Sequence, residues 1–189
     1  MSTDRNHAGT PQVEPVGPAT MLGPGEGRLI SGGALHATLK VAGGPAALTS
    51  TFEIEVPAGY DVGAHVHTHG EEIFYVVRGT VDLLAFEPVD RSIGDWHDWV
   101  AYDGRGYLRG GPGSMMHIPA GVPHAFANTS SESATLFFQS SPQGHEGYFE
   151  ELAALLRESG GRPDPAAVAE VRSRHDIFQL TSLVQGPGR

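Results

Sequence analysis

The chain has 189 residues, and its 12 Lys and Arg residues against 22 Asp and Glu residues give a formal net charge of -10. This length suits one domain with a sizeable core, alone or with a modest appendage. The acidic balance argues against binding to nucleic acid or to anionic membrane surfaces, which select basic patches, and the lack of cysteine excludes disulfides and thiolate ligands.

No run approaches the eighteen apolar residues that a membrane-spanning helix requires. The first residues carry an acid and lack the apolar core of a secretory signal. A cytoplasmic location is therefore the default expectation.

Residues 1–27 are rich in Pro, Gly, Thr and Glu without periodicity, which predicts a flexible leader. Ordered structure is expected from about Leu29. Strands are predicted over 35–41 and 48–56, and the second alternates apolar and polar residues, as in a sheet with one buried face.

The first stretch with a chemical pattern spans residues 59–79, GYDVGAHVHTHGEEIFYVVRG. Side chains alternate along a strand, so His65 and His67 point the same way and can both reach one metal ion. The apolar run after Glu72 predicts a second strand that folds back after a turn at His69 and Gly70. Glu72 has the opposite parity to the two histidines, so the turn or a bulge must reset the register.

Two neighbours of this pattern have less specific interpretations. His69 shares the parity of His65 and His67 but sits beside the turn glycine, which favours a place at the rim of a site. Glu71 should face away from Glu72 on the same strand, and it is expected to be solvated.

A strand over 80–87 is followed by a long stretch that we treat as an inserted loop, residues 87–112. It contains both tryptophans, Trp96 and Trp99, among many charged residues. Such a loop suits a planar, partly polar ligand or a subunit contact. The alternative, of equal weight, is that the two indoles pin the loop onto the domain.

The second pattern spans residues 113–128, GSMMHIPAGVPHAFAN. A short strand over 115–118 leads into a Pro-Ala-Gly turn, and His124 opens another apolar strand. For His117 the sequence favours neither packing nor a place in a cavity.

The last part of the chain, residues 146–189, is predicted to be a helical extension after a closing strand over 134–140. A helix is expected over 148–158, with one apolar face, and a second over 165–174, capped by Asp164. Phe178, Leu180 and Leu183 are expected in a final extended piece. These helices would plug the mouth of the domain or form a dimer face.

The two patterns together resemble the conserved motifs of the cupin superfamily, and ten specified positions fit in spacing and order: Gly59, His65, His67, Glu72, Gly79, Gly113, Pro119, Gly121, His124 and Asn128. The resemblance implies an all-β fold, a double-stranded β-helix or jelly-roll barrel over residues 28–145 with C-terminal helices. It also implies one divalent transition metal ion per chain (Fe, Mn, Co, Ni or Zn), held by His65, His67, Glu72 and His124.

Within the superfamily, the single barrel resembles the quercetin 2,3-dioxygenase-like monocupins. The resemblance implies a metal-dependent dioxygenase for a small aromatic or enolisable substrate, flavonol-like or polyketide-like, with dioxygen as a candidate co-substrate. Glu72 would be a ligand or would take a proton from the substrate. Strand parity and the aromatic loop suggest these pocket residues: Phe74, Val76, Met115, Phe126, Trp96 and Trp99.

Two alternatives stay open. One is a non-oxidative cyclase, isomerase or lyase that uses the metal only as a Lewis acid, and the other is a binding protein without turnover. Exposed edge strands of a jelly roll, together with the leader, predict a homodimer.

Overall fold

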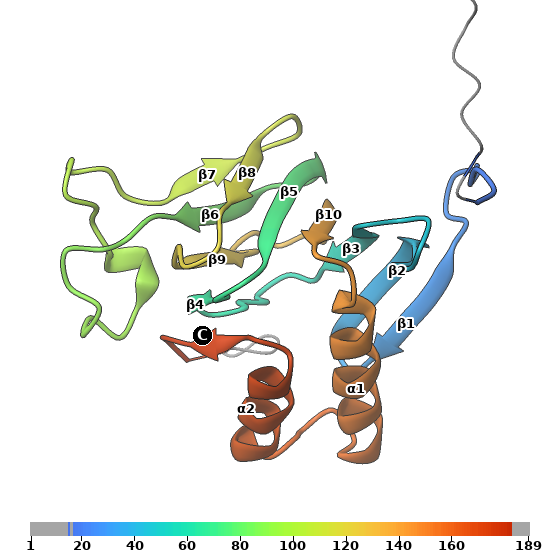
Figure 1. Cartoon of the computed structure of the whole chain (residues 1–189). Coiled ribbons are helices and arrows are strands. Elements are labelled where there is room, and N and C mark those ends of the chain that lie inside the picture. The colour runs from blue at the N-terminus through green and yellow to red at the C-terminus, as the bar shows by residue number, and fades with distance from the viewer. Residues whose placement is uncertain (1–14, 16, 183–189) are drawn as a thin grey trace, which may run out of the picture.

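The computed structural model describes residue 15 and residues 17–182, which form two facing antiparallel sheets with two helices beside them (Figure 1). The six-stranded sheet has the order β1 (Arg28–Gly32), β2 (Leu35–Val41), β3 (Ser50–Val56), β10 (Ala134–Ser141), β5 (Glu71–Arg78) and β8 (Met115–Ile118). The five-stranded sheet has the order β11 (Phe178–Gln179), β4 (His65–Val66), β9 (His124–Ala127), β6 (Val81–Ala85) and β7 (Leu108–Gly110). The predicted all-β fold with helices at its C-terminal end is confirmed.

The strands follow the sequence predictions with small shifts. The strands expected over 35–41 and 115–118 have those bounds, whereas the strand expected from residue 48 begins at Ser50 because Leu48 lies in an exposed connection. Regular structure begins at Arg28. Most of the predicted leader, and Leu183, lie outside the described residues.

Stacked aromatic rings fill the space between the sheets. The Phe138 ring packs 4.6 Å from the Phe74 ring and 5.6 Å from the Phe52 ring, centroid to centroid. Phe149, from the first helix, meets Phe52 edge to face at 5.0 Å. Rings of this size bury much apolar area, so the core extends from the sheets into the helical segment.

The helices α1 (His145–Glu158) and α2 (Pro165–Arg174) follow the last long strand. Helix α1 begins three residues earlier than predicted, and it packs against β1 and β2 through the expected apolar face. Helix α2 has the predicted cap, because the Asp164 side chain accepts a hydrogen bond from the Ala166 amide at 2.9 Å. Both helices lie on one side of the sheets (Figure 1).

The long loop between β6 and β7 is pinned by its tryptophans, each only 1% exposed. The indole nitrogen of Trp96 donates to Asp61 Oδ1 at 2.9 Å, and that of Trp99 donates to the Ile93 carbonyl at 2.8 Å. A 3-10 helix, η1 (Trp96–Asp98), carries the first of them. The pinning interpretation is therefore the one that the structure bears out.

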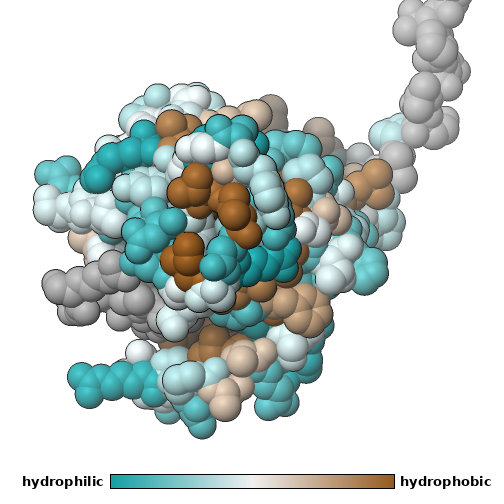
Figure 2. Space-filling model, turned by 90° about the vertical axis from the view of Figure 1, so that its left-hand side faces the viewer, coloured by the Kyte–Doolittle hydropathy of each residue, from teal (hydrophilic) through white to brown (hydrophobic). Residues whose placement is uncertain are grey.

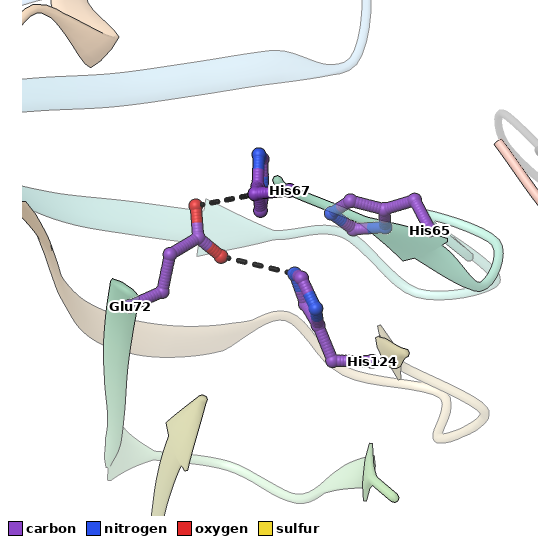
Figure 3. Close-up of side chains that lie close together, drawn as sticks. All are labelled: His65, His67, Glu72 and His124. Atoms are coloured by element: carbon purple, nitrogen blue, oxygen red, sulfur yellow. Dashed lines mark ion pairs between the residues drawn. The ribbon is translucent and has the colours of Figure 1, made fainter. Parts of the chain in front are cut away.

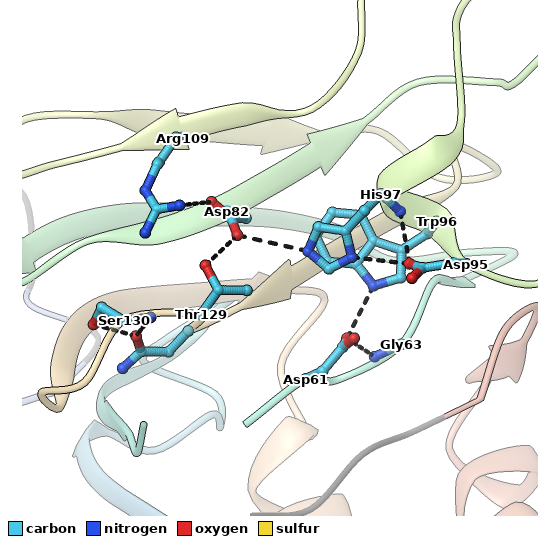
Figure 4. Close-up of polar contacts among 10 residues, drawn as sticks. Asp61, Gly63, Asp82, Asp95, Trp96, His97, Arg109, Thr129 and Ser130 are labelled. Carbon is cyan, nitrogen blue, oxygen red and sulfur yellow. Dashed lines mark hydrogen bonds and ion pairs between the residues drawn. The ribbon is translucent and has the colours of Figure 1, made fainter. Parts of the chain in front are cut away.

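A polar cluster fixes the same loop to the five-stranded sheet (Figure 4). Buried Asp82, on β6, accepts a hydrogen bond from the Thr129 hydroxyl at 2.7 Å and lies 3.6 Å from His97 Nε2. The other ring nitrogen of His97 lies 2.9 Å from Asp95 Oδ1. The His97 ring thus links the loop to the sheet through Asp82, while Asp95, in the same loop, contacts its other nitrogen.

Seen from the side of this loop, the surface shows apolar side chains gathered among polar ones (Figure 2). Large exposed apolar residues of the loop and its adjoining strands include Val89, Val100, Leu108 and Met115. In the part of the chain that the structure describes, no helix has the length and apolar character needed to cross a bilayer.

The anchoring of the loop predicts that Trp96→Phe lowers the free energy of unfolding by about 2 kcal/mol, because it leaves a small void and removes the donor to Asp61. Urea unfolding measures this loss. The control Tyr102→Phe changes a ring that is 80% exposed and should alter stability by less than about 0.5 kcal/mol. Equal stability of Trp96→Phe and the parent would contradict the pinning role.

Candidate metal centre

Four side chains from both sheets converge in the core (Figure 3). His65 lies on β4, directly opposite His124 on β9, and His67 follows β4 by one residue. Glu72 lies on β5. One ligand atom of each residue lies within 4.8 Å of the others, and all four residues are buried.

The parity problem at Glu72 is solved by a change of sheet. Strand β4 belongs to the five-stranded sheet and β5 to the six-stranded sheet, so the chain crosses between them over residues 67–70. Glu72 therefore approaches the centre from the sheet that faces the histidines. Alternation along one strand does not govern two residues on opposite sheets.

Backbone carbonyls fix the tautomer of each histidine. The Nδ1 atoms of His65, His67 and His124 lie 2.9, 2.9 and 3.0 Å from the carbonyl oxygens of Gly63, Asp176 and Val122. A carbonyl only accepts, so each Nδ1 carries the proton and each Nε2 offers a lone pair to the centre.

The Nε2 atoms of His67 and His124 are buried and have no donor for their lone pairs. They lie 3.2 and 3.1 Å from the two carboxylate oxygens of Glu72. Lone pairs that face a carboxylate at this distance repel, and a cation between them removes the repulsion. Three imidazoles and one carboxylate suit a divalent transition ion, so the residues fit the expected metal.

The pKa directions describe the same centre. Burial, and then His124, hold the pKa of His65 well below its usual value. Burial alone would lower the pKa of His67, but the adjacent Glu72 carboxylate raises it; burial alone would raise the pKa of Glu72, but His124 and then His67 hold it well below its usual value. The centre therefore favours positive charge beside an ionised Glu72.

The motif glycines and Asn128 hold the two patterns together. All four motif glycines, Gly59, Gly79, Gly113 and Gly121, have positive φ, which a side chain would disfavour. The Gly121 amide donates to the His67 carbonyl at 2.7 Å, and the Gly59 amide donates to the Asn128 carbonyl at 2.8 Å. The turn of the second pattern thus positions a histidine of the first.

Beside the four residues lies an inner cavity of about 50 Å³, with His65 and Glu72 in its wall. Phe74 and Phe126 line it as predicted, and Val76 is buried further along β5 without lining it. Trp96 and Trp99 lie in the loop and are not part of this wall.

The prediction for Met115 is wrong. Met115 is 59% exposed, while its neighbour Met116 is 5% exposed and packs inward opposite Phe74. Along β8, Met116 and Ile118 are buried and the residue before each of them is exposed, so the inward-facing side chains lie one residue later than predicted. His117 consequently faces outward too, 3.6 Å from the exposed Glu71.

An outer cavity of about 250 Å³ reaches the same centre from the surface. Its wall includes His67, Glu72, Tyr148 and His175. His69 also borders it with a side chain that is 86% exposed, in keeping with the expected place at the rim.

Sequence reasoning missed two residues that the helices bring to the inner cavity, the partly buried His145 and the buried Arg172. His145 Nδ1 lies 3.7 Å from Glu72 Oε1, and burial lowers the pKa of His145 to about 4. His145 shares a helical face with Phe149 and Leu152, and that spacing was the available signal.

Comparison with known proteins gives one family match and several distant likenesses. The family model described as Cupin matches residues 46–159. A conserved protein with a double-stranded β-helix domain from Klebsiella pneumoniae is 14% identical with a TM-score of 0.44, covering 60% of this chain and 82% of that chain. The cupin domain of Cnp3 from Schizosaccharomyces pombe is 13% identical with a TM-score of 0.44, covering 71% of this chain and 72% of that chain. No protein with a curated description matches the chain.

The ligand geometry predicts that His65→Ala, His67→Ala and His124→Ala each abolish metal retention, because each removes one of the clustered nitrogens. His69→Ala and His97→Ala should keep about one ion per chain, since neither side chain belongs to the group. Elemental analysis of the purified, folded variants measures this. Full metal content in His124→Ala would contradict the ligand assignment.

The hydrogen bond from His65 Nδ1 to the Gly63 carbonyl leads to a second prediction, which concerns metal affinity. Gly63 has a φ of +66°, and a Cβ there would lie 2.7 Å from the Ser182 carbonyl oxygen. Gly63→Ala should therefore shift the carbonyl that orients His65 and weaken metal binding about 10- to 100-fold in a competition titration. Gly104→Ala is the matched control, because Gly104 has a φ of +85° but open space around it. Equal affinities in the two variants would show that the carbonyl does not matter.

Proposed function

Because this chain belongs to the cupin family, we propose that it is a metal-dependent enzyme, a dioxygenase acting on a small enolisable or aromatic substrate. One observation carries the proposal: three imidazole nitrogens and a carboxylate meet beside an inner cavity, and two of these residues, His65 and Glu72, belong to its wall together with several aromatic rings. Such a cavity is the usual setting of a ligand site with a few convergent polar groups.

The residues would divide the work as follows. His65, His67, His124 and Glu72 would hold the ion, which when bound supplies Lewis acidity toward a substrate oxygen and, for a redox-active metal, access to dioxygen chemistry. The rings of Phe74, Phe126 and Phe138 would hold an apolar part of the substrate and exclude water.

The cavities favour a small substrate. The inner cavity of about 50 Å³ is much smaller than the roughly 300–1,000 Å³ of pockets for drug-sized ligands, which favours a small group there. A flavonol-like molecule needs more space. His145 and Tyr148 line both the inner and the outer cavity, so a larger substrate would have to displace these two side chains.

His145 favours the second candidate, a non-oxidative lyase, isomerase or cyclase. Its imidazole lies beside Glu72 but outside the group of four, and 14% of its side chain is exposed. With its pKa lowered to about 4, this imidazole is unprotonated near neutral pH, and it is free of the metal, so its nitrogen can accept a proton from a substrate. Chemistry of this kind needs a Lewis acid and a base, and it needs no dioxygen.

The first test is elemental analysis of the protein from a medium supplied evenly with Fe, Mn, Co, Ni and Zn, followed by oxygen uptake with small enols and flavonols. The dioxygenase proposal expects a redox-active metal and substrate-dependent oxygen consumption. Zinc alone, with turnover that persists without air, would favour the second candidate. A protein without metal would contradict both.

The position of His145 predicts that His145→Asn keeps the metal and lowers kcat about 10²- to 10⁴-fold, because the base is lost while the four ligands remain. Metal content and turnover are measured on the same sample. The control His117→Asn alters an outward-facing side chain that is 47% exposed and should leave both unchanged. Unchanged turnover in His145→Asn would exclude this histidine from the chemistry.

A further inference from the structure

Arg172 is a buried cation with no carboxylate beside it in the described part of the chain. The residue is 3% exposed. Its Nε donates to the Tyr148 hydroxyl at 3.2 Å, and its two terminal nitrogens reach only the Val62 carbonyl, each at 3.5 Å, the limit of a hydrogen bond. A guanidinium has five N–H donors, so two of them have no partner among the described residues and two more make only these long contacts.

Other arginines of this chain behave differently. Arg28, Arg91 and Arg174 are about half-exposed, and each forms an ion pair with a glutamate. Arg174 lies on the same helix as Arg172, two residues away. An unpaired cation in the interior is costly, so the exception at Arg172 requires a reason.

The guanidinium belongs to the wall of the inner cavity, with His65 and Glu72. Two tyrosines line the same cavity. The Tyr60 hydroxyl has no hydrogen-bond partner among the residues that the structure describes. Burial raises the pKa of Tyr60 to about 12, so this hydroxyl remains a donor near neutral pH.

The charge of the cavity changes when a metal ion binds. Glu72 and Arg172 are its buried charged residues, and in the metal-free protein their charges offset each other. Glu55 borders the cavity but is exposed, and buried Asp61 is engaged by Trp96 and the Gly63 amide. A divalent ion on three neutral imidazoles and Glu72 therefore gives the buried charges of the cavity a sum of about +2, which favours an anionic ligand.

We infer that Arg172, with the hydroxyls of Tyr60 and Tyr148, binds a carboxylate group of the substrate beside the metal. The cavity volume limits this substrate to a small organic acid anion, with its carboxylate at Arg172 and its reacting atoms toward His65 and Glu72. Planar guanidinium and carboxylate groups match in two parallel hydrogen bonds. The inference rests on the proposed function, because it names the substrate class of the same site.

The test compares acetate with acetamide, which have nearly the same shape but differ in charge. Full-length protein loaded with Zn²⁺ is titrated with each carboxyl-labelled compound and followed by ¹³C NMR. The parent should bind acetate at least tenfold more tightly than acetamide, and Arg172→Gln should lose that preference while it keeps its zinc. Arg174→Gln, on the exposed side of the same helix, should bind both compounds as the parent does.

If Arg172 had only a structural role, Arg172→Gln would change the binding of acetate and of acetamide to the same extent. Equal acetate affinity in Arg172→Gln and the parent would overturn the inference. If Arg172→Gln does not fold, Tyr60→Phe decides: weaker acetate binding with unchanged acetamide binding supports the inference, and no change contradicts it. If the parent holds no metal, the proposed function fails, and the same titration of the metal-free protein still decides whether Arg172 selects the anion.

Discussion

The repulsion among lone pairs in the core is the constraint on which this structure depends. Two unprotonated imidazole nitrogens face a carboxylate at 3.1 and 3.2 Å, and all three residues are buried. Such a group is unstable unless a positive charge lies within it. The hydrogen bonds at Nδ1 direct the lone pairs inward and keep the ring orientations that a cation needs. The local fold therefore prepares a site for a cation.

This centre also joins the two sheets. The histidines come from the five-stranded sheet and its margin, and Glu72 comes from the six-stranded sheet. The four ligands come together only when the sheets pack face to face. Metal binding at the centre would therefore also stabilise the packing of the two sheets. The apolar rings around it supply the remaining attraction, and they exclude the water that would otherwise screen the charges.

Local pattern predicted the ligands but only part of their surroundings. Spacing identified His65, His67, Glu72 and His124, because turn glycines and strand alternation act over a few residues. Met115 was misplaced because two adjacent methionines fit either phase of a four-residue strand, and only the pairing with β5 settles it. His145 and Arg172 reach the cavity because the helices dock beside it. The sequence around them predicts a helical face but does not predict what that face packs against.

The candidate metal ligands and Arg172 lie in different parts of the chain, and this separation bears on how substrate specificity is set. The family match ends at residue 159, so helix α2 with Arg172 lies beyond it, whereas all four candidate ligands lie within it. The turn after α2 also supplies the Asp176 carbonyl that orients His67, only four residues from Arg172. One short segment thus holds both the cation that would select the substrate and a support of the metal centre. Sequence changes in this segment would alter substrate choice and metal affinity together, while the barrel stays the same.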